Sequence, residues 1–303
     1  MSSTSTHSFS KLRVFGILGF GITAIGFSPI LVKLATDASP YLVAAGRTGI
    51  AFLLLLPFYF LRKKGEKRII STKEHISVAL AGILLGIHFI AWVSSIYYTS
   101  IASASVLVTI HPIVLILVER FFYHIRFRNT VWFGVAISFL GSVMIGYSDY
   151  DGETIHANPL LGNSLAVFAA LIFAIYFLIG NRVRQKRDWL EYVFPVYGYA
   201  AATAITAYFL MEGFSVDISG MVLLICLGLA LGPQIAGHGS LNYAVKYISP
   251  TVLSTLILFE PAISSTLAFF IFGEKPLPLS FAGMIVVLGG IILTWTRQAS
   301  HPD

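Results

Sequence analysis

Apolar residues lie along this chain in continuous runs of about twenty, separated by short polar segments. The runs do not alternate between apolar and polar positions, so each is predicted to be a helix and not a strand of a barrel. A helix of about 20 residues crosses a hydrocarbon layer about 30 Å thick. The pattern predicts an all-α integral membrane protein with ten transmembrane helices, at residues 13–34, 39–61, 76–97, 102–123, 131–148, 160–181, 190–211, 221–244, 250–272 and 277–296.

The composition agrees with lipid as the solvent. Charged residues make up 11% of the 303 residues, against about 25% in a soluble domain, and the mean hydropathy is +0.82. Cys226 is the single cysteine, which excludes an intramolecular disulfide and a cysteine-rich metal site. The chain has no glycine-rich phosphate loop and no zinc-protease motif, so we expect no cofactor, no metal and no enzymatic activity.

Eight residues recur after a fixed interval of 149, which divides the helices into two halves. The pairs are Tyr98/Tyr247, Ser100/Ser249, Ser105/Ser254, Leu107/Leu256, Pro112/Pro261, Phe121/Phe270, Gly134/Gly283 and Gly141/Gly290. Five helices per half is an odd number, so the second repeat is predicted to be inverted relative to the first. The expected organisation is a tail at 1–12, a repeat at 13–148, an outer linker at 149–159, a repeat at 160–297 and a tail at 298–303.

Lysine and arginine predict the orientation, because these residues are enriched in cytoplasmic loops. With the amino terminus in the cytoplasm, all basic residues fall on the cytoplasmic side except Lys33, Arg47 and Lys275. Both termini are then cytoplasmic. The net charge of +6 is explained by topology, and we expect no nucleic-acid partner. Lys33 and Arg47 would lie near the outer helix ends and reach to the interface, with binding of an anionic group as the alternative.

Four ionisable residues are predicted to lie within the membrane, where such groups usually face a cavity or a partner. They are His88, His111, His238 and Glu260. Trp92 shares a helix face with His88, and Asn242 shares one with His238, because each pair is four residues apart. Together with Tyr176, which could stack on a planar substrate, these seven residues are the predicted substrate-binding site. For the histidines, a hydrogen bond that bridges two helices is the alternative.

Prolines and glycines mark the predicted hinges. Pro112 and Pro261 each follow an ionisable residue and free a carbonyl one turn earlier, at Val108 and Ile257. The remaining predicted hinge residues weaken the helix at 221–244 and are Gly232, Pro233, Gly237 and Gly239. The spacing of Gly82 with Gly86, and of Gly228 with Gly232, is typical of close helix packing; a homodimer formed through these motifs is the alternative.

Several of these motifs together resemble the drug/metabolite transporter superfamily, and specifically its EamA-type members with ten helices. The resemblance covers residues 14–297 and rests on Ser28-Pro29-Ile30 with Lys33, Arg47, His88-Phe89 with Trp92 and Ser95, residues 103–112, Gly237-His238 with Asn242-Tyr243, Glu260-Pro261 and Gly273-Glu274. The family's Gly-Glu pair after the fourth helix is absent, because position 125 is Ile125. The resemblance implies transport of a small metabolite.

The leading hypothesis is a secondary transporter in the cell inner membrane that moves a small polar metabolite, an amino acid or a related compound, by alternating access. Glu260 is the candidate for proton coupling, because a carboxylate in lipid pairs, titrates or binds a cation. Proton-coupled export is one form of this hypothesis. A passive facilitator and a membrane-embedded interaction or chaperone subunit that carries no solute are the alternatives.

Overall fold

The computed structural model describes residues 11–62, 71–122, 124, 127–151, 157–248 and 250–295. These residues form helices and no strand. The helices are α1 (Lys11–Gly26), α2 (Ser28–Leu34), α3 (Pro40–Leu61), α4 (Thr72–Tyr98), α5 (Ile101–Val108), α6 (His111–Phe122), α7 (Asn129–Asp151), α8 (Pro159–Arg184), α9 (Trp189–Glu212), α10 (Gly220–Leu229), the π-helical segment η1 (Ala230–His238), α11 (Gly239–Ala244), α12 (Pro250–Leu256), α13 (Phe259–Phe272) and α14 (Pro278–Trp295).

Seven helical stretches of the described chain are long and apolar enough to cross a membrane. They are Leu12–Leu34, Pro40–Leu61, Thr72–Tyr98, Ile101–Phe122, Pro159–Arg184, Trp189–Glu212 and Gly220–Ala244, and they coincide with seven of the ten predicted spans. The other three spans contain shorter apolar helices at Asn129–Gly141, Phe259–Phe272 and Pro278–Gly290. These three spans stay predictions. Residues 1–10 of the first predicted tail, the whole second tail and residues 152–156 of the predicted linker lie outside the described residues. Residues 11 and 12 of the first predicted tail belong to α1.

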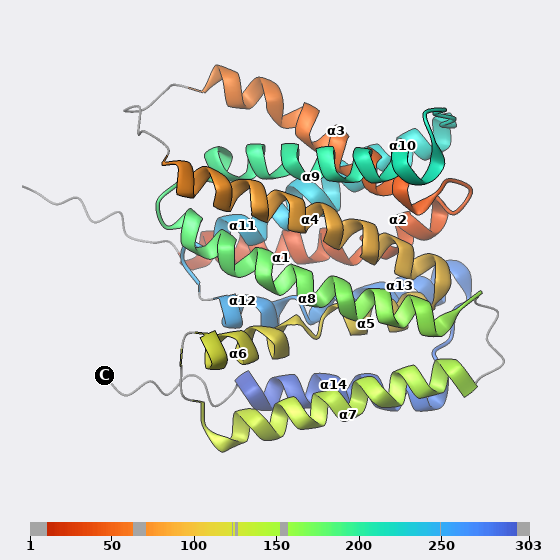
Figure 1. Cartoon of the computed structure of the whole chain (residues 1–303). Helices are drawn as coiled ribbons and strands as arrows, with labels where there is room; N and C mark the ends of the chain where they lie inside the picture. The colour runs from red at the N-terminus through yellow and green to blue at the C-terminus, as the bar shows by residue number, and fades with distance from the viewer. Residues whose placement is uncertain are drawn as a thin grey trace, which may run out of the picture.

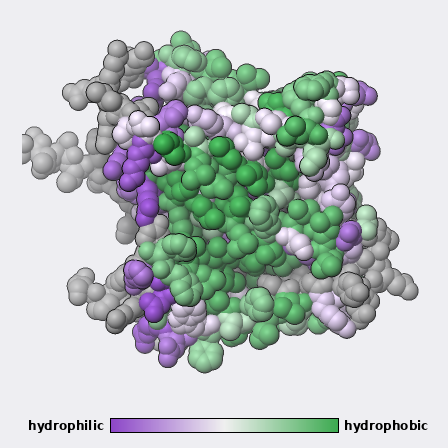
Figure 2. All heavy atoms as spheres, viewed as in Figure 1, coloured by the Kyte–Doolittle hydropathy of each residue, from purple (hydrophilic) through white to green (hydrophobic). Residues whose placement is uncertain are grey.

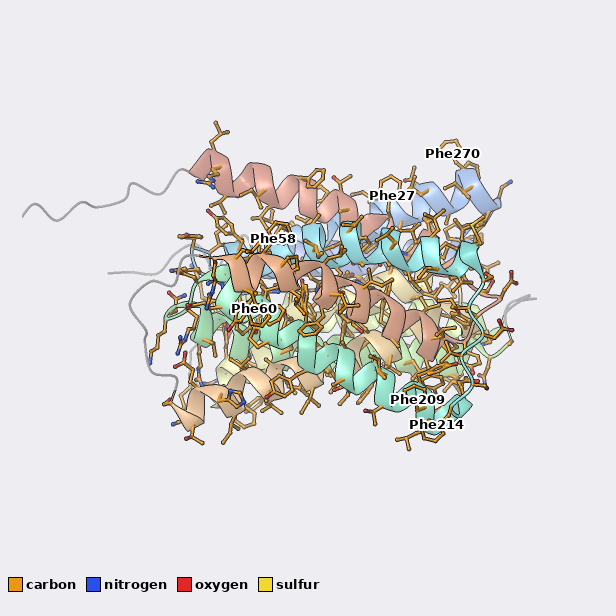
Figure 3. The ribbon with its side chains drawn as sticks, turned by 90° about the horizontal axis from the view of Figure 1, so that it is seen from above. Phe27, Phe58, Phe60, Phe209, Phe214 and Phe270 are labelled. Atoms are coloured by element: carbon orange, nitrogen blue, oxygen red, sulfur yellow. The ribbon has the colours of Figure 1, made fainter. Side chains whose placement is uncertain are left out.

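The helices run back and forth between the same two ends of a bundle (Figure 1). Apolar residues cover the middle of the face seen in Figure 2, and hydrophilic residues gather at both ends. Large apolar side chains are exposed around the bundle, among them Phe58, Phe60, Phe214 and Phe270 (Figure 3). A helical bundle with an apolar outer band suits lipid, because its backbone polar groups are satisfied inside each helix.

Polar residues just before five of the helices determine where these helices begin. Each accepts a hydrogen bond from the backbone N–H three residues later, which satisfies a donor that the first helical turn leaves free. The caps and their lengths are Ser39 at α3 (3.2 Å), Ser71 at α4 (3.3 Å), Ser100 at α5 (3.0 Å), Asn158 at α8 (3.1 Å) and Ser219 at α10 (3.2 Å). The start of each of these five helices is thus determined by a residue next to it in the sequence.

Two helices are interrupted where the sequence places proline. α5 ends at Val108 and α6 begins at His111, and in the same way α12 ends at Leu256 and α13 begins at Phe259. Proline has no N–H to continue the helical hydrogen bonds. The carbonyl of Val108 instead accepts a hydrogen bond from His111 Nδ1 at 3.2 Å. The two half-helix ends that result lie in the interior of the bundle.

Glycines bring α4 close to α9. A Cβ added at Gly82 would lie 2.6 Å from the carbonyl oxygen of Val196, and one at Gly86 would lie 2.9 Å from that of Ala200. The packing role predicted for this pair is therefore present. The second pair differs, because a Cβ at Gly228 would meet only Leu31 at 3.6 Å and one at Gly232 would meet no atom within 4 Å.

Candidate functional site

A small cavity lies in the interior of the bundle, where the interrupted helices meet α3, α4 and η1. Its volume is about 40 Å³, and it is lined by Ile25, Ser28, Arg47, His88, Phe89, Trp92, Val108, Thr109, His111, Phe173, His238, Leu241, Ile257 and Glu260. A water molecule needs roughly 10–15 Å³ of such space. The cavity therefore has room for a few water molecules, and in this conformation it is too small to hold a metabolite.

Five of the seven predicted site residues line this cavity together: His88, Trp92, His111, His238 and Glu260. They come from α4, α6, η1 and α13, which are far apart in the sequence. The rings of His88 and His238 lie with their centroids 6.1 Å apart, and Phe173 of α8 lies 4.8 Å from the ring of His111. The bundle thus assembles three histidines, a tryptophan and a carboxylate around one space.

The histidines are only partly satisfied by hydrogen bonds. His88 Nδ1 donates to the carbonyl oxygen of Ala169 at 2.9 Å, which fixes its ring against α8. His111 Nε2 and His238 Nδ1 are buried and have no partner among the described residues. An unpaired buried polar atom is costly, so these two nitrogens are available to a ligand or to water.

Glu260 lies in the first turn of α13 and is only 4% exposed. Within the part of the chain that the structure describes, its carboxylate makes no hydrogen bond and no ion pair. A carboxylate in such a position must exchange a proton, bind a cation or face a polar ligand.

Arg47 is the main correction to the sequence-based interpretation. Arg47 was expected to reach to the outer interface. It is instead 1% exposed and lines the cavity. Its Nε donates to Gln234 Oε1 at 3.1 Å and its Nη1 donates to Ser28 Oγ at 3.4 Å. The guanidinium carbon lies 4.0 Å from the ring centre of Phe89. Arg47 stays buried because α2, α4 and η1 surround it with acceptors and an aromatic face.

Tyr176 and Asn242 lie beside the cavity and do not line it. The hydroxyl of Tyr176 donates to Asn242 Oδ1 at 2.8 Å. The amide of Asn242 in turn donates to the carbonyl oxygen of His238 at 2.9 Å. This chain of hydrogen bonds holds the backbone of His238, so the two residues contact the cavity through that histidine.

The segment predicted to be weakened by glycine and proline adopts π-helical geometry. η1 contains Gly232, Pro233 and Gly237, and Gly239 follows it directly. Short π-helical pieces are rare and frequently occur at functional sites. Gly237 packs against α1, because a Cβ there would lie 2.5 Å from Ile25 Cγ1. Bending at these residues stays a prediction.

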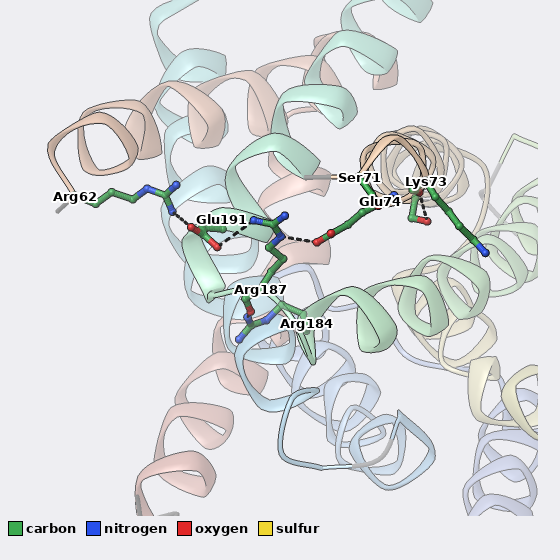
Figure 4. Close-up of polar contacts among 8 residues, drawn as sticks. Arg62, Ser71, Lys73, Glu74, Arg184, Arg187 and Glu191 are labelled. Atoms are coloured by element: carbon green, nitrogen blue, oxygen red, sulfur yellow. Dashed lines mark hydrogen bonds and ion pairs between the residues drawn. The ribbon is translucent and has the colours of Figure 1, made fainter. Parts of the chain in front are cut away.

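A group of charged residues lies at the bundle end that carries the arginines of α8 (Figure 4). Arg187, between α8 and α9, donates to Glu74 of α4 and lies 3.7 Å from Glu191 of α9. Arg62, just after α3, lies 3.1 Å from the same Glu191. The hydrogen bond to Glu74 raises the pKa of the Arg187 guanidinium above its usual value. These contacts join α3 and α4 to α9.

Sequence reasoning missed Gln234, Phe89 and Phe173 as neighbours of the site, and it misplaced Arg47. Apolar and amide side chains carry no signal of their own within an apolar run. For Arg47 a signal was present: it lies seven residues inside α3, about two helical turns from the helix start at Pro40,. Among the described residues, no group of three His, Cys, Asp or Glu side chains could hold a metal ion.

Comparison with known proteins identifies the chain's relatives. The profile of the EamA-like transporter family matches twice, at residues 14–147 and 160–296. An uncharacterized transporter of Bacillus subtilis, YdfC, is 26% identical over 95% of this chain and 92% of its own length. The uncharacterized inner membrane transporter YedA of Escherichia coli is 23% identical over 96% of this chain and 93% of its own length.

A solved crystal structure has the same fold. It superposes with a TM-score of 0.67 at 18% sequence identity, covering 96% of this chain and 100% of that chain. The family indicates a transporter rather than an enzyme. Three observations agree: the apolar outer surface, the buried ionisable groups of the cavity and the two family matches. The chain is a multi-pass membrane transporter that belongs to the EamA-like transporter family.

Proposed function

We propose that this protein is a secondary transporter that moves a small polar metabolite, an amino acid or a related compound, by alternating access through the central cavity. The observation that carries the proposal is the convergence of Arg47, Glu260 and three histidines on one cavity. Ionisable groups are expensive inside a membrane and are retained where they serve a substrate or ion pathway. The name of the Escherichia coli relative supports the cell inner membrane as the location.

The proposal includes ten spans in two inverted repeats, with both termini in the cytoplasm. The interval of 149 supports it, because adding it to the bounds of α3 (Pro40–Leu61) gives 189–210, against Trp189–Glu212 for α9. The same shift takes α5 close to α12, α6 close to α13 and α7 close to α14. The two family matches, at 14–147 and 160–296, lie in the proposed repeats at 13–148 and 160–297.

Residues related by this interval also line the cavity together, which supports a site placed between the repeats. The related pairs that line it are Phe89 with His238, Trp92 with Leu241, Val108 with Ile257, and His111 with Glu260. Inverted repeats place the substrate site at their interface near the middle of the membrane. Two similar halves can then exchange conformations, which opens the site first to one side and then to the other.

The interrupted helices and η1 supply the hinges of this motion in our proposal. Pro112 and Pro261 lie at the start of α6 and α13, where few helical hydrogen bonds need to break. The segment that carries His238 bends, in the same proposal, at Gly232, Pro233, Gly237 and Gly239. Tyr176 and Asn242 belong to the site through the backbone of His238.

We assign proton coupling to Glu260. When Glu260 is ionised, its charge is compensated by a proton donor, a cation or the cationic part of a substrate. When it is protonated, it needs no such partner, so a proton and a cationic group compete for the same carboxylate. Net transport then depends on the proton gradient.

Counterflow in proteoliposomes tests the function. Vesicles are loaded with pools of unlabelled amino acids, nucleobases and other small metabolites, and uptake of the labelled pool is followed for the wild type, Glu260→Gln and Glu212→Gln. Glu212 is an exposed residue at the end of α9 and serves as the matched control. We expect saturable exchange that Glu212→Gln retains and whose pH dependence Glu260→Gln removes.

Other outcomes separate the alternatives. Flux without saturation or counterflow would indicate a passive facilitator. Folded protein that exchanges no pool would favour an interaction or chaperone subunit. Normal transport with unchanged pH dependence in Glu260→Gln would overturn the coupling role while leaving the transporter itself in place.

A further inference from the structure

Two neighbouring donors next to the cavity lack an acceptor. Arg47 Nη2 and Gln234 Nε2 are both buried, and neither has a hydrogen-bond partner among the described residues. The two side chains are linked to each other, because Arg47 Nε donates to Gln234 Oε1 at 3.1 Å. This contact also fixes the amide orientation, since the opposite orientation would place an N–H group against the guanidinium. The part of the chain that the structure describes therefore supplies no acceptor for these two donors.

The guanidinium is held in a defined plane, which suits recognition of a planar anion. Phe89 covers its face at 4.0 Å and Trp92 lies 5.7 Å from its central carbon. Gln234 and Ser28 occupy two other nitrogens. Nη2 is the guanidinium nitrogen that has no partner among the described residues. Arginine binds carboxylates through short, charge-assisted hydrogen bonds, and a side chain that is already held in place loses little freedom on binding.

Among the described residues, the guanidinium of Arg47 forms no ion pair. Glu260 lines the same cavity and its charge acts on Arg47, but the two side chains are not in direct contact as an ion pair. A buried cation without an anion is strongly unfavourable. A negative group supplied by the ligand would compensate it.

The surroundings restrict this anion to a single charge. Arg47 is the one arginine or lysine among the residues that line the cavity, so a second negative charge on the ligand would have no matching permanent cation there,. The walls of the cavity are mainly apolar and aromatic, with Phe89, Trp92 and Phe173 among the lining residues, and they suit an apolar side chain on the ligand. A carboxylate meets these conditions better than a phosphate, which carries more charge at neutral pH.

We propose that Arg47 is the anchor for a carboxylate of the transported substrate, so that the protein carries solutes with one carboxylate and rejects analogues without it. This inference rests on the proposed function, because it concerns the same cavity. Gln234 supplies the second donor. His111 Nε2 and His238 Nδ1 remain for another polar group of the substrate.

Matched probes test the inference in wild-type protein. One pool holds labelled amino acids and the corresponding 2-oxo acids, and the second holds amines and carboxamides with the same side chains. We expect counterflow with the first pool and none with the second. Equal exchange of the amines or carboxamides would overturn the carboxylate anchor and leave the transporter function intact. Folded protein that exchanges neither pool would overturn the carboxylate anchor too, and the broader metabolite panel then decides the function separately.

Variants of Arg47 provide an independent readout. Arg47→Gln removes the charge and Arg47→Lys keeps it without the fork, and both should raise the KM for carboxylates more than about tenfold. Lys33→Gln is the matched control, because Lys33 is a basic residue of α2 that does not line the cavity. Size-exclusion profiles and thermal unfolding establish that each variant is folded. A KM for Arg47→Gln within about twofold of the wild type would overturn the proposal. If the variants do not fold, the comparison of the two substrate pools in wild-type protein decides the question.

Discussion

His238 and Phe89 are in edge-to-face contact, with their ring centroids 4.9 Å apart, and their positions in the chain differ by the interval of 149. A second contact has the same relation: Ser138 Oγ donates to the carbonyl oxygen of Val287 at 3.2 Å, and these positions also differ by 149. When a residue touches its own equivalent, the axis that relates the two halves passes close by. In the proposed arrangement of two repeats, these contacts place the axis beside the cavity and between α7 and α14.

The α7–α14 interface makes this relation testable. A Cβ at Gly141 would lie 2.7 Å from the oxygen of Gly283, and one at Gly290 would lie 2.6 Å from the oxygen of Gly134. Gly141→Ala and Gly290→Ala should each separate the helices and destabilise the protein by about 1–3 kcal/mol. Thermal unfolding in detergent measures the loss.

Gly289→Ala is the control for this pair of substitutions. A Cβ at Gly289 would meet no atom within 4 Å, so alanine should leave stability unchanged or raise it by up to about 1 kcal/mol through its helix propensity. A similar loss in all three variants would contradict close packing at the axis.

The sequence was sufficient to predict much of the fold for a simple reason. Apolar runs and proline positions act locally, so seven spans and the interruptions at Pro112 and Pro261 were predictable from the residues alone. The environment of Arg47 was not, because it depends on Ser28, Phe89 and Gln234, which only packing brings to α3. Burial of a charged side chain depends on partners distant in sequence, and single-sequence reasoning does not provide them.

Tyr176 should act on the site by positioning and not by touching the substrate. Tyr176→Phe removes the donor to Asn242 Oδ1, and the buried acceptor left behind should cost about 1–3 kcal/mol of stability. The KM should rise by no more than about threefold, because Tyr176 does not line the cavity. Unfolding and counterflow measure the two effects.

Tyr208→Phe is the control for loss of a tyrosine hydrogen bond elsewhere in the bundle. The hydroxyl of Tyr208 donates to the backbone carbonyl oxygen of Ser215 at 2.7 Å, and Tyr208 does not line the cavity. The substitution should lower stability and leave the KM unchanged. A KM increase of more than about tenfold in Tyr176→Phe alone would show direct substrate contact.

Glu274 has a structural role in this conformation. Its Oε1 accepts a hydrogen bond from the backbone nitrogen of Ile101 at 3.2 Å and so caps the start of α5. Glu274→Ala should cost about 1 kcal/mol, as the loss of a helix cap usually does. Glu212→Ala, at an exposed position, should be neutral in the same unfolding measurement. A loss of transport in folded Glu274→Ala at unchanged stability would show a role in transport instead.

The charged contacts around Arg187 should hold one end of the bundle closed. Glu74 belongs to the first proposed repeat, whereas Arg187 and Glu191 belong to the second. If this end opens to the cytoplasm during transport, these ion pairs must separate first. Glu74→Gln should therefore favour the open state by about 1–2 kcal/mol, which is a factor of roughly 5 to 30 in population.

Thiol labelling measures this change directly. In a Cys226→Ser background, Ser240→Cys places a buried thiol in α11, just beyond His238 on the side of the charged cluster. A membrane-impermeant maleimide applied from the cytoplasmic side should label it faster when Glu74→Gln is added, by the same factor. Lys73→Gln changes the neighbouring exposed residue and should leave the rate unaltered. Equal rates with and without Glu74→Gln would mean that the cluster does not control access to this buried position of α11, because opening would then require no separation of these charges.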